Sequence, residues 1–261
     1  IMENLGAIEA QHQVTILFAC ESGSRGWGFA SPDSDYDVRF IYVNRLPWYL
    51  TVAPARDVIE LPISGDLDIN GWDLRKALGL MRESNPTLLE WLCSPIVYRE
   101  EAETMSRFRA LAEQVFSNAK GWHHYASMAK KNFREHLQAD EVRYKKYLYV
   151  LRPLLAARWI RTQPGVPPMR FAELAQHTLD AVLTKARLWQ RWAATPLNER
   201  QVKLLNKLLD GFEGKLTSSK WAAIAKCSPD TALRDINDLL TRGVMRKSDA
   251  GGRSTSYELN D

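Results

Sequence analysis

The chain has 261 residues, of which 45% are hydrophobic and 25% charged, and its net charge of +4 is too small to indicate a nucleic-acid partner by itself. No run of about 18 apolar residues occurs and no basic-then-apolar leader opens the chain, which argues against a membrane span and a secretory signal. The three cysteines lack CxxC spacing, so we expect neither disulfides nor a zinc cluster, and we expect a reducing, cytoplasmic location.

Short β-rich runs dominate the first hundred residues. Apolar or alternating segments bounded by turn residues predict strands there. In the last of these runs, Asp68, Asn70 and Trp72 share one face, because alternate residues of a strand point to the same side. The predicted strands cover residues 14–20, 36–43, 57–63 and 67–72.

Helical periodicity begins at Leu74 and continues through most of residues 101–162, where Pro153 is expected to kink or restart a helix. A further helical stretch ends near Trp192. Beyond residue 197, three helical runs precede two β-rich runs that flank a Gly-Gly turn, the layout of a winged helix. Those helical runs cover residues 198–210, 217–226 and 229–242.

The most informative motif joins a Gly-Ser step to two closely spaced carboxylates. Gly23 and Ser24 follow the first predicted strand, and Asp35 and Asp37 stand two residues apart where the second one begins. Side chains two apart in a strand share a face and can hold a divalent metal together. Glycine lets backbone N–H groups approach phosphates closely. The motif therefore predicts nucleotidyl transfer from a nucleoside triphosphate.

A third carboxylate completes the expected site. Two Mg²⁺ (or Mn²⁺) ions would activate the attacking oxygen and neutralise the leaving group, and carboxylates on adjacent strands suit that task. Asp68 is our choice for the third ligand and for the group that takes the proton from the attacking hydroxyl, with Asp66 as the runner-up. We expect Gly23 and Ser24 to hold the triphosphate, and Ser34 either to cap the turn or to contact phosphate.

Several basic residues are candidates for contacts with the triphosphate. Arg25 and Arg39 lie close to the carboxylates in sequence, and Arg39 is in phase with them, so it would pair either with them or with phosphate. Lys145 or Lys146, together with Arg152, would lie near one face of a predicted helix. A solvated basic face explains that helix nearly as well.

The motif and its surroundings resemble a known superfamily. Gly-Ser followed by Ser34-Asp35-Tyr36-Asp37 resembles the signature of the DNA polymerase β nucleotidyltransferases. Residues 21–29, 37–42, 57–60, 72–76 and 84–86 resemble one branch, the RNA-repair-associated RlaP or YcgL-like group. This resemblance covers roughly residues 8–175. It implies that Asp68, in the strand before the Leu-Arg-Lys helix, is the third metal ligand, while the family's acceptor is poorly defined.

The C-terminal part has a different resemblance. Residues 180–261 look like the winged-helix tail of Fic-family AMP-transferring proteins, although the Fic catalytic motif is absent, and we expect a junction near residues 178–185. A winged helix would contact DNA through its third helix and wing. We expect protein interaction or dimerisation ahead of DNA binding for this part of the chain. The nucleic-acid candidates are Arg234, Asn237, Arg246, Lys247 and Arg253.

Together these patterns predict an α+β protein with three parts. Residues 1–100 would form a nucleotidyltransferase core with a small mixed sheet, 101–180 a helical region completing the nucleotide site, and 181–261 a linker helix and winged helix. The expected activity moves NMP from an NTP to an RNA 3′ end, such as that of tRNA. The alternatives are AMP transfer to a protein side chain and a non-catalytic regulator that senses nucleotide and binds DNA.

Overall fold

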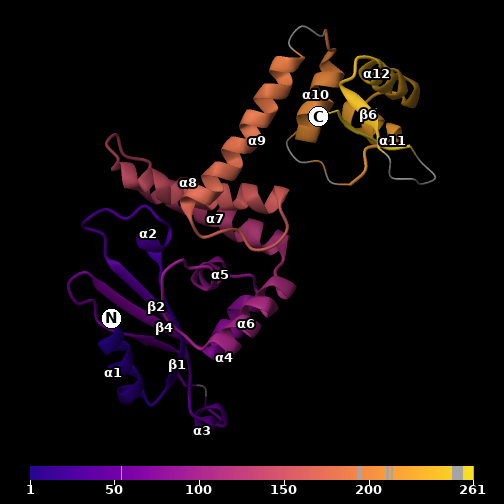
Figure 1. Ribbon diagram of the computed structural model, residues 1–261. Helices are drawn as coiled ribbons and strands as arrows, with labels where there is room; N and C mark the ends of the chain where they lie inside the picture. The colour runs from indigo at the N-terminus through magenta and orange to yellow at the C-terminus, as the bar shows by residue number, and fades with distance from the viewer. Residues whose placement is uncertain (54, 193–195, 210–211, 213, 249–254, 261) are drawn as a thin grey trace. The chain divides into compact units, whose positions relative to one another are not determined.

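The chain divides into two units, Ile1–Thr178 and Leu179–Asp261. The structure is a computed structural model, and it describes residues 1–53, 55–192, 196–209, 212, 214–248 and 255–260 (Figure 1). Helix α9 (Phe171–Arg191) contains the point of division.

A five-stranded mixed sheet forms the centre of the first unit. The strand order is β3-β4-β2-β1-β5, in which β2 and β4 are parallel and the other neighbours antiparallel. This agrees with the small mixed sheet expected from the sequence. The strands are β1 (Thr15–Glu21), β2 (Tyr36–Val43), β3 (Val58–Glu60), β4 (Leu67–Asp73) and β5 (Val97–Glu100).

The prediction was right for β2 and too long for the third strand. Residues 57–63 were expected to be extended as one strand, but β3 contains only Val58–Glu60. Leu61 still donates its N–H to the carbonyl of Ile69, at 3.1 Å. Pro62 follows and has no N–H to continue the ladder, so the strand ends before it. Strand β5 was not predicted.

Helices cover both faces of the sheet (Figure 1). Helix α1 (Met2–His12) buries Leu5 and Ile8 against the face of β2 that carries Val38 and Phe40. The opposite face carries Phe18 and Ile41 under a second group of helices. That group consists of α4 (Leu74–Arg82), α5 (Pro86–Leu92) and α6 (Ala102–Val115). The alternation of β2 thus sends Asp37 and Arg39 to the face covered by α4–α6.

Side-chain caps fix where the helices after β4 begin. The buried carboxylate of Asp73 accepts the N–H of Arg75 at 2.8 Å, which satisfies a free donor in the first turn of α4. Asn85 accepts the N–H of Leu88 at 3.2 Å and caps α5, with Pro86 at the first helical position. These caps therefore set the two helix starts at the positions that the polar residues occupy in the sequence.

Two long helices form the second layer of the unit, α7 (Asn118–His136) and α8 (Tyr144–Thr162). Helix α8 runs through Pro153, so the helix does not restart there, and the alternative expectation of a kink stays a prediction. Proline removes the N–H that would bond to the carbonyl four residues earlier, which is that of Tyr149. The side chain of Asn132 donates to that carbonyl instead, at 2.8 Å. A neighbouring helix therefore replaces the hydrogen bond that Pro153 removes.

After the C-terminal part of α9, the described residues of the second unit form three further helices and then a two-stranded antiparallel sheet, in the order predicted from the sequence. Its core gathers around Trp221, Leu204 and Ile236, all fully buried. The assignment of this unit as a winged helix remains a prediction. The elements are α10 (Glu199–Leu209), α11 (Ser218–Ala225), α12 (Pro229–Thr241), β6 (Met245–Lys247) and β7 (Tyr257–Leu259). Over the described part of the chain, no helix is both long and apolar enough to cross a bilayer.

Candidate active site

Two of the predicted carboxylates meet across parallel strands. Asp37 of β2 lies in register with Asp68 of β4. The guanidinium Nη2 of Arg39 lies 2.8 Å from Asp37 Oδ1 and 2.7 Å from Asp68 Oδ2. Arg39 Nη1 also donates to the main-chain carbonyl of Asp68, at 3.1 Å. The parallel pairing therefore brings residues 31 positions apart to one cation on one face of the sheet.

The Gly-Ser step packs directly against Asp37. Gly23 begins the short helix α2 (Gly23–Gly26) with a φ of +55°. A Cβ at this position would overlap Asp37 Oδ2 and lie 2.9 Å from its Cγ, so the Asp37 carboxylate would have to shift. Ser22 donates its N–H to the Asp37 carbonyl at 2.8 Å, and Ser24 is buried. Glycine at this position is therefore what lets the loop and the carboxylate share the site.

The carboxylates carry more negative charge than Arg39 offsets. Burial raises the pKa of Asp37 above its ordinary value, and the carboxylates of Asp68 and Asp35 raise it further, while Arg39 opposes them. Asp35 directly precedes β2 and is exposed. These hard oxygen donors and their unbalanced charge fit Mg²⁺ or Mn²⁺. In the described residues, no three acidic, His or Cys side chains converge as they would around a bound ion.

Arg25 holds the loop that delivers Asp35. Its Nη2 donates to the Ser34 carbonyl at 2.7 Å and its Nε to the Asp35 carbonyl at 3.1 Å. Its guanidinium also lies 3.9 Å from the centre of the Tyr36 ring. Arg25 therefore connects the start of α2 to the chain entering β2. The predicted phosphate contact of Arg25 remains a prediction.

Lys145 reaches the same loop from α8. Its Nζ lies 2.7 Å from Ser34 Oγ and 3.2 Å from Ser31 Oγ. The Nζ of the neighbouring Lys146 instead lies 5.3 Å from the centre of the Tyr149 ring. The sequence left Lys145 and Lys146 as equal candidates, and the structure brings Lys145 to the loop of the carboxylate motif.

Arg152 lies in the core and pairs with protein groups, so its predicted contact with nucleotide finds no support in its surroundings and stays a prediction. Its side chain is fully buried, and its Nη1 lies 2.5 Å from Glu90 Oε1 of α5. Its Nε donates to the Met169 carbonyl at 3.0 Å. Glu90 also accepts the indole N–H of Trp27, which follows the Gly-Ser helix, at 3.0 Å. Arg152 lies about two helical turns beyond Lys145 on the same face of α8. At Lys145 this face contacts the loop before Asp35, and at Arg152 it is buried in the core.

Sequence reasoning missed Glu21, the last residue of β1. Its carboxylate is buried and accepts the N–H of Asp37 at 2.8 Å and the hydroxyl of Tyr98. Burial raises the pKa of Glu21, an effect that these hydrogen bonds oppose. A carboxylate at the end of a predominantly apolar strand was the available signal. Glu21 therefore holds the backbone of β2 in place at Asp37, one of the predicted catalytic carboxylates.

The remaining candidates are Asp66 in the first unit and five residues of the second. Asp66, the runner-up to Asp68, is exposed in the turn before β4, where its carbonyl accepts the N–H of Tyr36. In the second unit, Arg234 donates to the Thr231 hydroxyl at 3.3 Å and Arg246 pairs with Glu258 at 2.9 Å. Asn237 accepts a hydrogen bond from Thr241 through its carbonyl, Lys247 is exposed on β6, and Arg253 lies outside the described residues.

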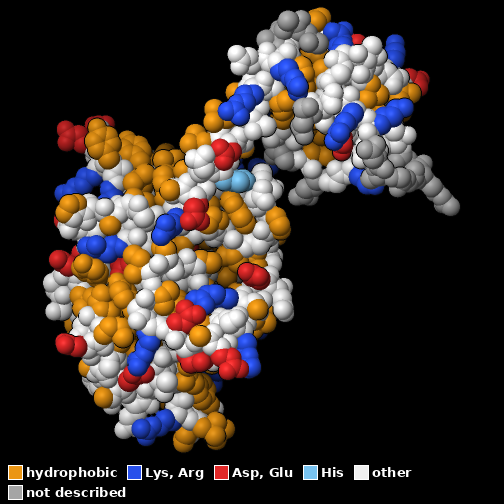
Figure 2. All heavy atoms as spheres, viewed as in Figure 1, with side chains coloured by type: hydrophobic (Ala, Val, Ile, Leu, Met, Phe, Trp, Pro, Cys, Tyr) orange, Lys and Arg blue, Asp and Glu red, His pale blue; other side chains and the backbone are white. Residues whose placement is uncertain are grey.

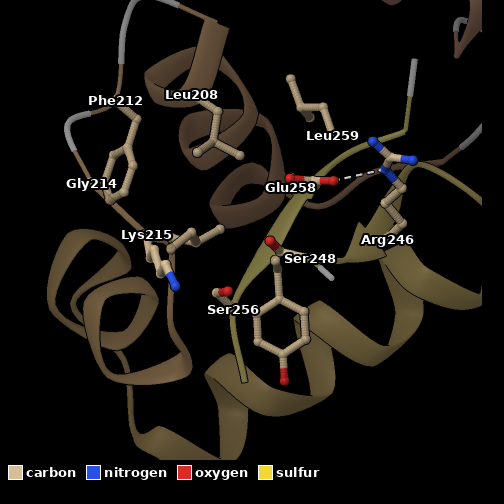
Figure 3. Close-up of a pocket in the computed structure, with 11 residues that line it drawn as sticks. Leu208, Phe212, Gly214, Lys215, Arg246, Ser248, Ser256, Glu258 and Leu259 are labelled. Carbon is tan, nitrogen blue, oxygen red and sulfur yellow. Dashed lines mark ion pairs between the residues drawn. The ribbon is translucent and has the colours of Figure 1, made fainter. Parts of the chain in front are cut away.

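A pocket of about 400 Å³ opens in the second unit (Figure 3). Its lining includes Leu208, Phe212 and Tyr257, and Figure 3 marks the ion pair between Arg246 and Glu258 at its edge. Of the predicted site residues that the structure describes, only Arg246 lines this pocket. The lining residues named for the pocket all belong to the second unit.

A Gly-Ser loop packed on a strand carboxylate, with a second carboxylate on the next parallel strand, is the arrangement expected of a polymerase-β-like nucleotidyltransferase. The sequence matches the family described as RlaP, RNA repair pathway DNA polymerase beta family, over residues 1–242, and the chain belongs to that family. This membership indicates nucleotidyl transfer as the class of reaction. The match also passes the junction expected near residues 178–185 and includes most of the second unit.

Two individual proteins are similar to the chain to different degrees. The chain is 48% identical over 188 residues to the uncharacterized protein YcgL of Bacillus subtilis (strain 168), which covers 72% of each. A nucleotidyltransferase-like protein from Exiguobacterium sibiricum 255-15 aligns over 99% of both chains, with 13% identity and a TM-score of 0.32, too low to carry an argument. These comparisons lend no support to the resemblance between the second unit and the Fic-family tail.

Proposed function

We propose that the protein is a metal-dependent nucleotidyltransferase that moves NMP from an NTP to an acceptor hydroxyl, with an RNA 3′ end as the acceptor. The observation that carries this proposal is the pairing of Asp37 with Asp68 beside Gly23. The family match supports the reaction class, and its description, which refers to RNA repair, supports the acceptor.

Residues of the first unit would bind the phosphates, accept the proton and position the carboxylates. Gly23 and Ser24 lie at the start of α2, where backbone N–H groups and the small side chains suit the β- and γ-phosphates. Lys145 supplies positive charge beside Ser34 for the same phosphates. Asp68 takes the proton from the attacking hydroxyl. Arg25 and Glu21 hold Asp35 and Asp37 in place through backbone hydrogen bonds.

Asp35, Asp37 and Asp68 would hold Mg²⁺ or Mn²⁺. When bound, such ions lower the pKa of the attacking oxygen and neutralise the charge of the departing pyrophosphate. Arg39 is the cation that Asp37 and Asp68 share in this structure. The guanidinium contacts one oxygen of each carboxylate, and the NTP phosphates are alternative partners for it.

Labelled NTPs test the proposal directly. The protein is incubated with each α-³²P-labelled NTP, Mg²⁺ and total RNA, and in parallel with RNase-treated cell extract. We expect label in the RNA with wild type and none with Asp37→Asn. The matched control is Asp66→Asn, because Asp66 is exposed in the turn before β4 and should leave labelling unchanged. Label that appears only in protein would replace RNA by a protein side chain as the acceptor, and no label anywhere would refute the transferase.

A further inference from the structure

Helix α8 has two apolar faces, although only one of them is buried. Val150, Ala156 and Ile160 pack inward. On the opposite side, four large side chains stand in solvent at helical spacing, with exposed fractions of 44% to 91%. They are Tyr144, Tyr147, Leu151 and Leu154. A solvated helix normally turns polar residues outward, so this outer face indicates a surface that another molecule covers.

The charge on this face has one sign. Exposed Arg143 stands at one end of the apolar row, and exposed Arg158 and Arg161 stand at the other. The helix itself contains no Asp or Glu, and the nearest acidic residues in sequence, Asp140 and Glu141, lie in the loop before it. Figure 2 shows hydrophobic side chains along the segment that Figure 1 labels α8. The expected occupant is therefore anionic and has apolar surfaces of its own.

This outer face begins beside the catalytic carboxylates. Lys145, the residue after Tyr144, contacts Ser31 and Ser34 immediately before Asp35. The two tyrosines are thus at the end of α8 nearest the motif, and the row extends away from it. Arg158 follows Tyr144 by 14 positions, which corresponds to about 21 Å along a helix. That is enough length for a short single strand with its end at the site.

A second copy of the same face fits poorly. Two α8 helices packed antiparallel would bring Arg143 of one copy next to Arg158 or Arg161 of the other, and a parallel pair would align like charges at both ends. Such contacts are unfavourable once they are desolvated. Phosphates and stacked bases instead match the arginines and the tyrosine rings.

We propose that the outer face of α8 is the platform for the single-stranded 3′ end of the RNA acceptor, with Tyr144 and Tyr147 stacking on unpaired bases and Arg158 and Arg161 contacting the backbone. This inference rests on the proposed function, since it names where the acceptor of that reaction binds. It does not depend on which nucleotide is transferred.

Binding of RNA by the full-length protein without NTP tests the platform separately from catalysis. The probe is a fluorescein-labelled single-stranded RNA of about 12 nucleotides, followed by fluorescence anisotropy at several salt concentrations. Tyr144→Ala/Tyr147→Ala should weaken binding roughly tenfold or more, whereas Tyr144→Phe/Tyr147→Phe keeps the rings and should stay within about twofold of wild type. Arg158→Glu/Arg161→Glu should weaken binding and reduce the salt dependence.

Matched controls come from the solvent-exposed side of α6. Leu111 has an exposed fraction of 39%, and the side chain of Arg107 is 79% exposed. Leu111→Ala and Arg107→Glu should both bind RNA like wild type. Equal binding by the alanine pair and wild type would overturn the platform. So would tighter binding of a fluorescein-labelled poly-glutamate peptide, which would indicate an acidic protein partner, or a wild-type dimer that the alanine pair dissociates.

The two proposals fail in different ways. RNA binding that depends on Tyr144 and Tyr147, with no nucleotide transferred to any acceptor, would refute the transferase and support the platform. Transfer to RNA with the same KM for RNA in the alanine pair as in wild type would support the transferase and overturn the platform.

Discussion

Asp37 and Asp68 occupy paired positions on neighbouring parallel strands, and their carboxylates contact the same Arg39 guanidinium. Because both side chains lie on one face of the sheet, they approach each other without any departure from regular strand pairing. The site is therefore set by strand register, which the buried side chains of β2 and β4 enforce.

Replacement of Gly23 by alanine should abolish nucleotide transfer. The new Cβ would overlap Asp37 Oδ2, and the φ of +55° already disfavours a side chain. We expect a loss of stability of about 1–2 kcal/mol from the backbone alone, with a further loss because Asp37 must move. Thermal unfolding and the labelled-NTP assay measure the two effects.

The matched control for this change is Gly65→Ala. Gly65 has a similar φ of +58°, yet no heavy atom outside its chain neighbours lies within 4 Å of the point where the alanine methyl group would stand. The substitution should lower Tm by a comparable backbone contribution and leave transfer intact. If both alanine variants retained activity, the close packing of Gly23 on Asp37 would have no catalytic importance.

Asp37→Asn should raise Tm at neutral pH while transfer is lost. Burial, Asp68 and Asp35 together raise the pKa of Asp37, so the folded protein binds its proton more tightly than the unfolded chain does. The charged carboxylate therefore costs stability above the raised pKa, and this cost disappears as the pH falls toward the ordinary value. Thermal unfolding from about pH 7 to about pH 4 should show the Tm difference shrinking with acid. A difference that grows with acid would contradict this charge balance.

Lys145→Ala should raise the KM for NTP roughly tenfold, because one charge-assisted contact beside Ser34 is lost. Lys146→Ala is the matched control, since it removes the same charge from the next position, where the ammonium group lies over the Tyr149 ring. Steady-state kinetics on NTP compare the two. Equal effects would mean that α8 contributes a diffuse positive field instead of a specific contact.

Arg152→Met should destabilise the fold by about 3–5 kcal/mol, because it leaves the buried Glu90 carboxylate without its charged partner. The double variant Arg152→Met/Glu90→Gln should regain part of that loss, since glutamine still accepts from Trp27. Chemical denaturation measures the free energies. Exposed Arg158→Met on the same helix should stay within about 0.5 kcal/mol of wild type. If Arg152→Met instead left stability unchanged and raised the KM for NTP, the predicted contact of Arg152 with nucleotide would be supported.

Local patterns in the sequence predicted β2, β4 and the helices that follow Leu74 in both units, whereas α1 was not predicted. The bounds of β2 were predicted correctly because apolar and charged residues alternate at the start of Tyr36–Val43 and apolar ones complete it. Alternation in β4 likewise predicted the face that carries Asp68, which is the face of the sheet that also carries Asp37. Strand β5 escaped prediction because its four residues are short and partly exposed, and their pairing with β1 supplies the order that their own pattern lacks.

The contacts that connect distant segments were not predictable in the same way. Arg152 belongs to a basic helix in sequence, and only the packing of α8 against α5 shows that it pairs with Glu90. Glu21 gave a weak signal, because a single carboxylate after a strand is also typical of a surface turn. Its partners Asp37 and Tyr98 lie 16 and 77 positions away. Such partners depend on register and topology, which a single sequence does not specify.

The contact between Lys145 and Ser34 also has a consequence for synthesis. Ser34 emerges from the ribosome 111 residues before Lys145 does. The segments that form the strands with Asp37 and Asp68 are thus synthesised long before Lys145. During translation the carboxylates would be present without Lys145, whose contact with Ser34 forms only once α8 has been synthesised.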